Sequence, residues 1–318
     1  MQGGKRVLIT GGSGFLGSHL CESLLRRGDE VICVDNMLTG SPANVEHLHS
    51  SESFTLIEAD VTQPLPVDGP VDAVLHLACP ASPQDYVKWP LETLNAGSAG
   101  TQIALDLAYE TGATFLLASS SEVYGDPLVH PQPETYWGNV NPIGPRSSYD
   151  ESKRFSEALT VAYRESRGVD CRIARIFNTF GPRMRQDDGR MVPTFISQAI
   201  SQQPITVAGD GSQTRTLCYV TDTVEGIMRL LHRPERVLSP VNIGGRREMS
   251  ILETAQIIRK FVDSSSPIKF VPRMQDDPQV RSPDLTLAGA LLKWEPKVRL
   301  EDGIRKTIDW FSSSQACV

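Results

Sequence analysis

Tyr149 and Lys153 stand four residues apart, so on a helix they would share one face. A tyrosine is a base near neutral pH only if its pKa, about 10 in a free side chain, is lowered. A neighbouring ammonium lowers this pKa because it favours the phenolate. Residues 119–122 (SSSE) follow directly on an apolar stretch, where an open α/β sheet presents its ligand-binding groups. The pattern therefore predicts a proton-transfer site with Tyr149 as the base.

A glycine-rich loop near the start of the chain predicts the cofactor. Gly11, Gly14 and Gly17 lie between a short apolar strand at 6–10 and a helical pattern, and a second strand ends just before Asp35. The glycines allow a tight turn and bring the backbone close to a pyrophosphate at the N-terminus of the helix. Asp35 would accept hydrogen bonds from ribose hydroxyls and repel a 2′-phosphate, which favours NAD over NADP.

Strand-like and helix-like segments alternate after this unit, which predicts a Rossmann-like, doubly wound parallel α/β sheet followed by a smaller C-terminal substrate-binding domain. We expect residues 1–178 to form the NAD-binding domain, with 216–245 returning to it, and 179–318 to bind the substrate. The further strands are expected at 54–58, 73–77, 114–117, 171–176 and 240–243, and the principal helices at 91–109 and 150–167.

Composition excludes several classes of protein. The chain has 318 residues with 40% hydrophobic and 22% charged side chains, typical of a globular protein of about two domains. A net charge of -7 argues against nucleic-acid binding. The six cysteines are scattered without a C-x-x-C pair, which favours reduced thiols in a cytoplasmic enzyme and no metal site. We expect no signal peptide and no membrane span.

Arginines gather after residue 176 among glycines and prolines. Arginine suits bidentate contacts with phosphate oxygens, so the cluster predicts an anionic ligand. Its members are Arg175, Arg183, Arg185, Arg190 and Arg215, with Arg281 in a later segment.

Longer strings carry a family resemblance over nearly the whole chain. They are PASP at 80–83, SEVYGDPLVHPQPETYWGNVNPIGPR at 121–146, RIFNTFGPRM at 175–184, GSQTR at 211–215 and QDDPQ at 275–279. With the glycine loop, Asp35 and the Tyr149/Lys153 pair, the sequence resembles the UDP-glucuronate decarboxylases of the extended short-chain dehydrogenase/reductase superfamily.

The resemblance implies NAD as a recycled cofactor and UDP-glucuronate as the substrate. It implies that Tyr149 takes the C-4 hydroxyl proton, that Lys153 holds the phenolate state, and that Ser120 hydrogen-bonds the C-4 oxygen. Glu122 is expected to handle a proton or a water near C-5. The implied cofactor contacts are Gly11, Gly14, Phe15, Leu16, Gly17, Asp35, Asn36, Thr39, Gly40, Asp60, Val61, Leu77, Tyr149, Lys153, Thr179 and Arg190. The implied substrate contacts are Asn178, Val192, Thr206, Arg215 and Arg281.

Three other functions stay open at this point. A nucleotide-sugar 4,6-dehydratase shares the first oxidation, but many dehydratases carry an Asp-Glu pair where this chain has Ser121 and Glu122. The usual 4-epimerase motif lacks this glutamate. A non-catalytic NAD-sensing protein could use the same fold. The helices expected at 91–109 and 150–167 are apolar over more than one face, which predicts a homodimer built on them.

Overall fold

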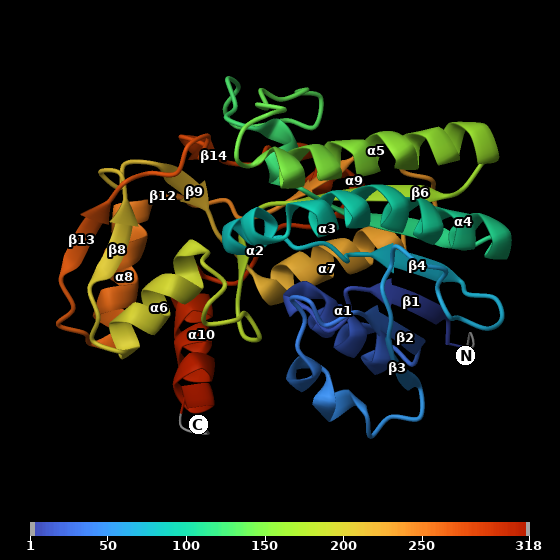
Figure 1. Ribbon diagram of the computed structural model, residues 1–318, viewed down its shortest axis with the longest axis horizontal. Coiled ribbons are helices and arrows are strands. Elements are labelled where there is room, and N and C mark those ends of the chain that lie inside the picture. Colours follow the sequence, from blue (N-terminus) through green and yellow to red (C-terminus); the bar gives the residue numbers. More distant parts are fainter. Residues whose placement is uncertain (1–3, 316–318) are drawn as a thin grey trace.

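A parallel sheet of seven strands lies at the centre of the larger part of the molecule (Figure 1). The computed structural model describes residues 4–315. The strands run in the order β11-β6-β5-β4-β1-β2-β3, and the direction of winding reverses between β1 and β4. Their bounds are β1 Arg6–Thr10, β2 Glu30–Asp35, β3 Phe54–Glu58, β4 Ala73–His76, β5 Thr114–Ser120, β6 Cys171–Ile176 and β11 Val241–Ile243. This is the doubly wound, Rossmann-like sheet that the alternating pattern predicts, and its ligand crevice lies where the winding reverses.

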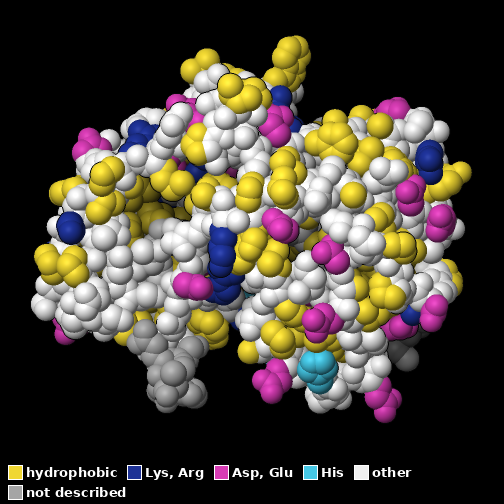
Figure 2. Space-filling model, viewed as in Figure 1, with side chains coloured by type: hydrophobic (Ala, Val, Ile, Leu, Met, Phe, Trp, Pro, Cys, Tyr) yellow, Lys and Arg dark blue, Asp and Glu magenta, His cyan; other side chains and the backbone are white. Residues whose placement is uncertain are grey.

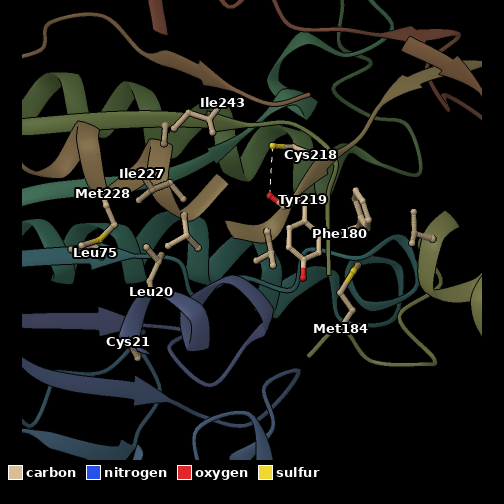
Figure 3. Packing of buried hydrophobic residues seen from close by; sticks show 14 of the residues in the cluster. Leu20, Cys21, Leu75, Phe180, Met184, Cys218, Tyr219, Ile227, Met228 and Ile243 are labelled. Atoms are coloured by element: carbon tan, nitrogen blue, oxygen red, sulfur yellow. Dashed lines mark hydrogen bonds between the residues drawn. The ribbon is translucent and has the colours of Figure 1, made fainter. Parts of the chain in front are cut away.

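Helices cover both faces of the sheet because its strands are apolar on both sides. On one face, Leu20 of α1 packs with Leu75 of β4 and Ile227 of α7 (Figure 3). On the other face, Leu105 of α4 and Tyr163 of α5 pack with Phe115 of β5. The helices are α1 Phe15–Arg26, α2 Pro83–Lys88, α3 Pro90–Asn95, α4 Thr101–Thr111, α5 Ser147–Arg167 and α7 Val220–Leu231.

The smaller part of the molecule is built from segments that follow residue 190 and lies at the left of Figure 1. A three-stranded sheet in the order β12-β9-β14 faces the larger part, and its register places Arg281 of β14 beside Arg215 of β9. Its elements are α6 Met191–Ile200, β8 Ile205–Ala208, β9 Thr214–Thr216, β12 Glu248–Ser250, α8 Ile251–Val262, β13 Ile268–Val271, β14 Val280–Arg281 and α10 Leu300–Gln315. The remaining elements are β7 Thr179–Phe180, β10 Cys218–Tyr219 and α9 Thr286–Leu292.

One predicted helix is divided in the structure. The segment expected as a single helix over 91–109 forms α3, a π-helical turn over Ala96–Gly100, and α4. The turn brings Gly97 against α5, where a Cβ at Gly97 would lie 2.6 Å from the Cβ of Ser152. Ser156 of α5 donates to the Gly97 carbonyl at 2.7 Å. Close contact between the π-helical turn and α5 determines the local backbone conformation. The spacing of hydrophobic residues in the sequence does not reveal this contact.

The structure also tests three expectations about the described residues, which concern the cysteines, a membrane span and a metal site. Cys21, Cys33, Cys79, Cys171 and Cys218 are free thiols, and Cys317 lies outside the described range. Between residues 4 and 315, no helix has both the length and the apolar character needed to cross a membrane. Over the same range, no cluster of three or more His, Cys, Asp or Glu side chains is arranged to hold a metal ion.

Candidate active site

A cavity of about 550 Å³ lies between the carboxyl ends of the central strands and the smaller part of the molecule. It brings together every site residue predicted from the sequence except Arg281. The lining includes Gly11, Gly14, Phe15, Leu16, Gly17, Asp35, Asn36, Thr39, Gly40, Asp60, Val61, Leu77, Ser120, Glu122, Tyr149, Lys153, Asn178, Thr179, Arg190, Val192, Thr206 and Arg215. Residues that are far apart in the sequence therefore line one cavity.

The end of the cavity near β1 fits a dinucleotide. Gly11 has a φ of +71°, and a Cβ there would lie 2.8 Å from the backbone of Ala78, so the loop requires glycine. The first turn of α1 has no side-chain cap at Gly14, which leaves backbone N–H groups for a pyrophosphate. Asp35 accepts from the backbone N–H of Ser13 at 3.0 Å and of Met37 at 2.9 Å. Its carboxylate oxygens retain lone pairs for the ribose hydroxyls.

Tyr149 and Lys153 occupy the first turns of α5 and are both buried. The Lys153 ammonium donates to the Ala118 carbonyl at 2.9 Å and lies 5.8 Å from the centroid of the Tyr149 ring. Burial raises the pKa of Tyr149, and a hydrogen bond with Ser120 and the charge of Arg190 only partly oppose it. In the protein alone, desolvation of the phenolate outweighs the neighbouring charges, and a pKa lowered by Lys153 together with the nicotinamide stays a prediction.

Glu122 follows the end of β5 and is held between two arginines. Its carboxylate accepts from the Arg146 guanidinium at 2.6 Å and forms an ion pair with Arg281 at 3.1 Å. Burial acts to raise the pKa of Glu122, but Arg281 and Arg146 outweigh it and lower the pKa to about 2. At neutral pH Glu122 is consequently an anion and a hydrogen-bond acceptor.

Two of the predicted arginines lie away from the cavity wall. Arg281 is 1% exposed and lies behind Glu122, where it also donates to the Ser121 hydroxyl at 3.0 Å and the Gly125 carbonyl at 2.7 Å. Arg175 forms a bidentate ion pair with Glu157, at 2.9 and 2.7 Å. Both guanidinium groups therefore bind groups of the protein itself in this structure.

The cavity also contains residues that the sequence reasoning missed. The ring of Tyr86 stacks on that of Tyr149, with centroids 5.2 Å apart and an interplanar angle of 11°. Arg146, which ends one of the family strings, holds Glu122, and Asp277 lies within another string. Asp85, a further residue of the lining, forms an ion pair with the predicted Arg185. Arg146 and Asp277 could have been identified from their positions within the family strings, but those strings do not show which residues they bind.

Known proteins share both the sequence and the arrangement. Residues 7–244 match the NAD dependent epimerase/dehydratase family. The UDP-glucuronic acid decarboxylase 1 of Danio rerio is 53% identical over 97% of this chain and 73% of its own length. Among solved structures, an epimerase from Methanothermobacter thermautotrophicus superposes with a TM-score of 0.92 at 28% identity, covering 99% of this chain and 94% of that one. The UDP-glucuronic acid 4-epimerase from Bacillus cereus, solved with UDP-glucuronic acid and NAD, has a TM-score of 0.86 at 28% identity, covering 97% and 99%. The resemblance inferred from the motifs is thus confirmed, and the chain belongs to the NAD dependent epimerase/dehydratase family and, within it, to the UDP-glucuronic acid decarboxylases.

Proposed function

We propose that this chain converts UDP-glucuronate to UDP-xylose and carbon dioxide through a UDP-4-keto intermediate, with NAD recycled in every turnover. The observation that carries the proposal is the single cavity that joins the dinucleotide cradle, the Ser120, Tyr149 and Lys153 set, and a Glu122 held as an anion. On this proposal residues 1–178 with 216–245 form the NAD-binding domain, and 179–318 form the substrate domain.

The chemistry explains why an enzyme without net oxidation needs NAD. A uronic acid resists decarboxylation because no electron sink lies next to its carboxylate. Oxidation of the C-4 hydroxyl gives a β-keto acid, in which the ketone accepts the electron pair released with carbon dioxide. NAD, when bound, supplies the hydride acceptor at C-4 and the hydride donor that closes the cycle. The reaction is therefore a carboxy-lyase reaction with an internal redox cycle.

Tyr149 takes the proton of the C-4 hydroxyl in the first step and returns it in the last. Ser120 is placed to hydrogen-bond the C-4 oxygen, since its hydroxyl already interacts with that of Tyr149. The stacked ring of Tyr86 fixes the plane of the Tyr149 ring. Burial opposes the phenolate, so the positive charges of Lys153 and of the oxidised nicotinamide ring together stabilise it.

Glu122 acts after the oxidation. Because its two arginines hold it ionised, it is a poor proton donor, and we assign it to orienting a water that gives a proton to C-5 and takes one up from the solvent in exchange. Asn178 and Arg215 are placed to hold the diphosphate, and the wall at Val192 and Thr206 to hold the uracil. A dehydratase would instead need an acid for the leaving hydroxyl beside Glu122, where this chain has Ser121 bonded to Arg281.

Incubation of the purified protein with UDP-glucuronate and catalytic NAD tests the proposal. The expected products are carbon dioxide and a UDP-pentose. A 4,6-dehydratase would leave UDP-glucuronate unchanged, because this substrate has no C-6 hydroxyl to lose, and would release water from UDP-glucose. A C-4 epimer of the substrate would indicate an epimerase. NAD binding without turnover of any nucleotide sugar would support the sensing function.

We also propose a homodimer formed through the helical segment from α3 to α4 and through α5, the two segments expected at 91–109 and 150–167. Apolar side chains remain exposed along these helices and the adjoining α2: Val87 is 52% exposed, Leu91 68% and Phe155 51%. Figure 2 shows hydrophobic side chains on the face where Figure 1 places these helices. A twofold axis through this face would bury them in a four-helix contact.

The free thiols suit a cytoplasmic location, which we propose as well.

A further inference from the structure

A chain of alternating charges runs from Arg215 in the cavity wall to Arg281 behind it. One oxygen of Asp277, Oδ1, lies 3.1 Å from an Nη of Arg215 and 3.9 Å from an Nη of Arg146. Arg146 in turn binds Glu122 at 2.6 Å, and Glu122 binds Arg281. The other oxygen, Oδ2, lies 3.5 Å from Nε of Arg273, and Oδ1 is therefore the acidic link between Arg215 and the Arg146–Glu122 pair.

Arg215 is placed for an additional anion. Its side chain is 11% exposed, and its other Nη donates to the Thr214 carbonyl at 2.8 Å. Burial lowers the pKa of Arg215, and the charges of Arg281 and Arg146 lower it further, so the carboxylates of Asp277 and Glu122 only partly compensate its charge. On the proposed function, on which this inference rests, the diphosphate of the substrate binds here and competes with Asp277.

We propose that Asp277 is a positioning residue that couples diphosphate binding at Arg215 to the Arg146–Glu122 pair. When the diphosphate takes Arg215, Oδ1 of Asp277 is released and moves onto Arg146, which it contacts only loosely at 3.9 Å. Arg146 then shares its charge between two carboxylates, and its hold on Glu122 weakens. Glu122 then accepts a stronger hydrogen bond from the water and orients it at C-5 only when the nucleotide is bound; the proton that this water gives to C-5 is replaced from the solvent. Binding energy at a remote part of the substrate is thus used at the reacting carbon.

Several charged groups surround Glu122, and their positions decide which of them can change its ion pairs. Arg281 approaches from β14, Arg146 from the start of α5, and Arg215 from β9. Asp150 of α5 and Tyr86 of α2 also interact electrostatically with Glu122. Arg281 is 1% exposed and bonded to Ser121 and Gly125 as well, so it is fixed. Both arginines have a buried Nε without a partner, but Arg146 is the one that also forms an ion pair with Asp277, at 3.9 Å.

The test is Asp277→Asn, with Asp276→Asn as the matched control. Asp276 lies on the same segment but accepts from the Asn141 side chain at 2.9 Å, outside the charge chain. Removal of the competing carboxylate should make UDP bind about fivefold tighter in calorimetry, the effect of an ion pair of modest strength. The kcat for decarboxylation of UDP-glucuronate should fall about tenfold without a rise in KM. The control should leave both quantities within twofold.

Opposite movement of UDP affinity and kcat distinguishes coupling from a structural role, which would weaken both. Unchanged or weaker UDP binding in Asp277→Asn would overturn the competition at Arg215. Tighter UDP binding with an unchanged kcat would overturn the coupling to Glu122. Asp277→Ser, which removes the same charge, serves if the asparagine variant does not fold. UDP calorimetry needs no turnover, so absence of carbon dioxide from the unmodified enzyme would refute the proposed function separately.

Discussion

Replacement of Glu122 by glutamine should destabilise the fold by about 3 kcal/mol at neutral pH. The structure lowers the pKa of this carboxyl from 4.5 to about 2, and 1.36 kcal/mol for each pKa unit gives about 3 kcal/mol. Loss of one partner from a buried ion pair typically costs about 3–5 kcal/mol, which agrees. Arg281, 1% exposed, would be the uncompensated charge.

Urea denaturation of the two proteins as a function of pH measures this contribution. Because the folded-state pKa is lowered, the stabilisation is present above the unfolded-state value of about 4.5 and is lost as the pH falls towards 2. The difference between the proteins should be complete at pH 7 and fall to roughly half or less near pH 3. A matched control is Glu151→Gln, whose pair with Arg154 is 3.6 Å long and partly exposed, and which should cost less than about 1 kcal/mol.

The same variant separates the steps of catalysis. If Glu122 acts after oxidation, a single turnover of Glu122→Gln should still show NADH absorbance, while release of carbon dioxide and product slows. Equal unfolding midpoints for Glu122→Gln and the unmodified protein at pH 7 would refute the electrostatic argument. Loss of the NADH signal in a folded variant would place Glu122 in the first step.

Three further substitutions test other parts of the site and surface. Tyr149→Phe should fold and bind NAD but lose turnover by orders of magnitude, because it removes the base; near-normal turnover would assign that role to another group. Asp35→Ala should weaken NAD binding and lessen discrimination against NADP, because the ribose acceptor and the repelling charge are lost together; titrations that show unchanged affinities for both would exclude this role. Phe155→Glu should halve the mass seen by light scattering at micromolar concentration, since a charge would enter the proposed interface; a monomeric unmodified protein, or an unchanged mass in the variant, would reject that interface.

Local signals in the sequence predicted the larger part of the fold well. The glycine loop, the strand that ends at Asp35 and the regular alternation that follows are each determined by near neighbours in sequence. The strand expected at 114–117 extends to Ser120, because hydrogen bonding to β6 continues as Ser119 pairs with Arg175 and Ser120 with Ile176. Pairing with β6 determines where β5 ends, and the pattern of apolar residues does not indicate this pairing.

Contacts between distant residues limited the prediction of the site. Residue type identified Arg281 and Arg175 as anion binders, but both are occupied by carboxylates of this chain, Glu122 and Glu157. The pKa of Tyr149 depends on burial as well as on nearby charge, and spacing gives the position of Lys153 but not the extent of burial. The ion-pair partners of the arginines and the burial of Tyr149 depend on the assembled fold. Spacing in the sequence could therefore identify these residues but not describe their surroundings.

The ion pair between Arg281 and Glu122 joins positions 159 residues apart, and this separation bears on how the protein is made. During synthesis the sheet from β1 to β6 can form while β14 is still untranslated, since domains fold progressively from the N-terminus. Until Arg281 arrives, Glu122 lacks one of its two arginines, and closure of so long a loop is among the slow events of folding. A nascent chain would therefore acquire its dinucleotide cradle well before its decarboxylation site, and catalytic competence would appear only when the C-terminal segments have docked.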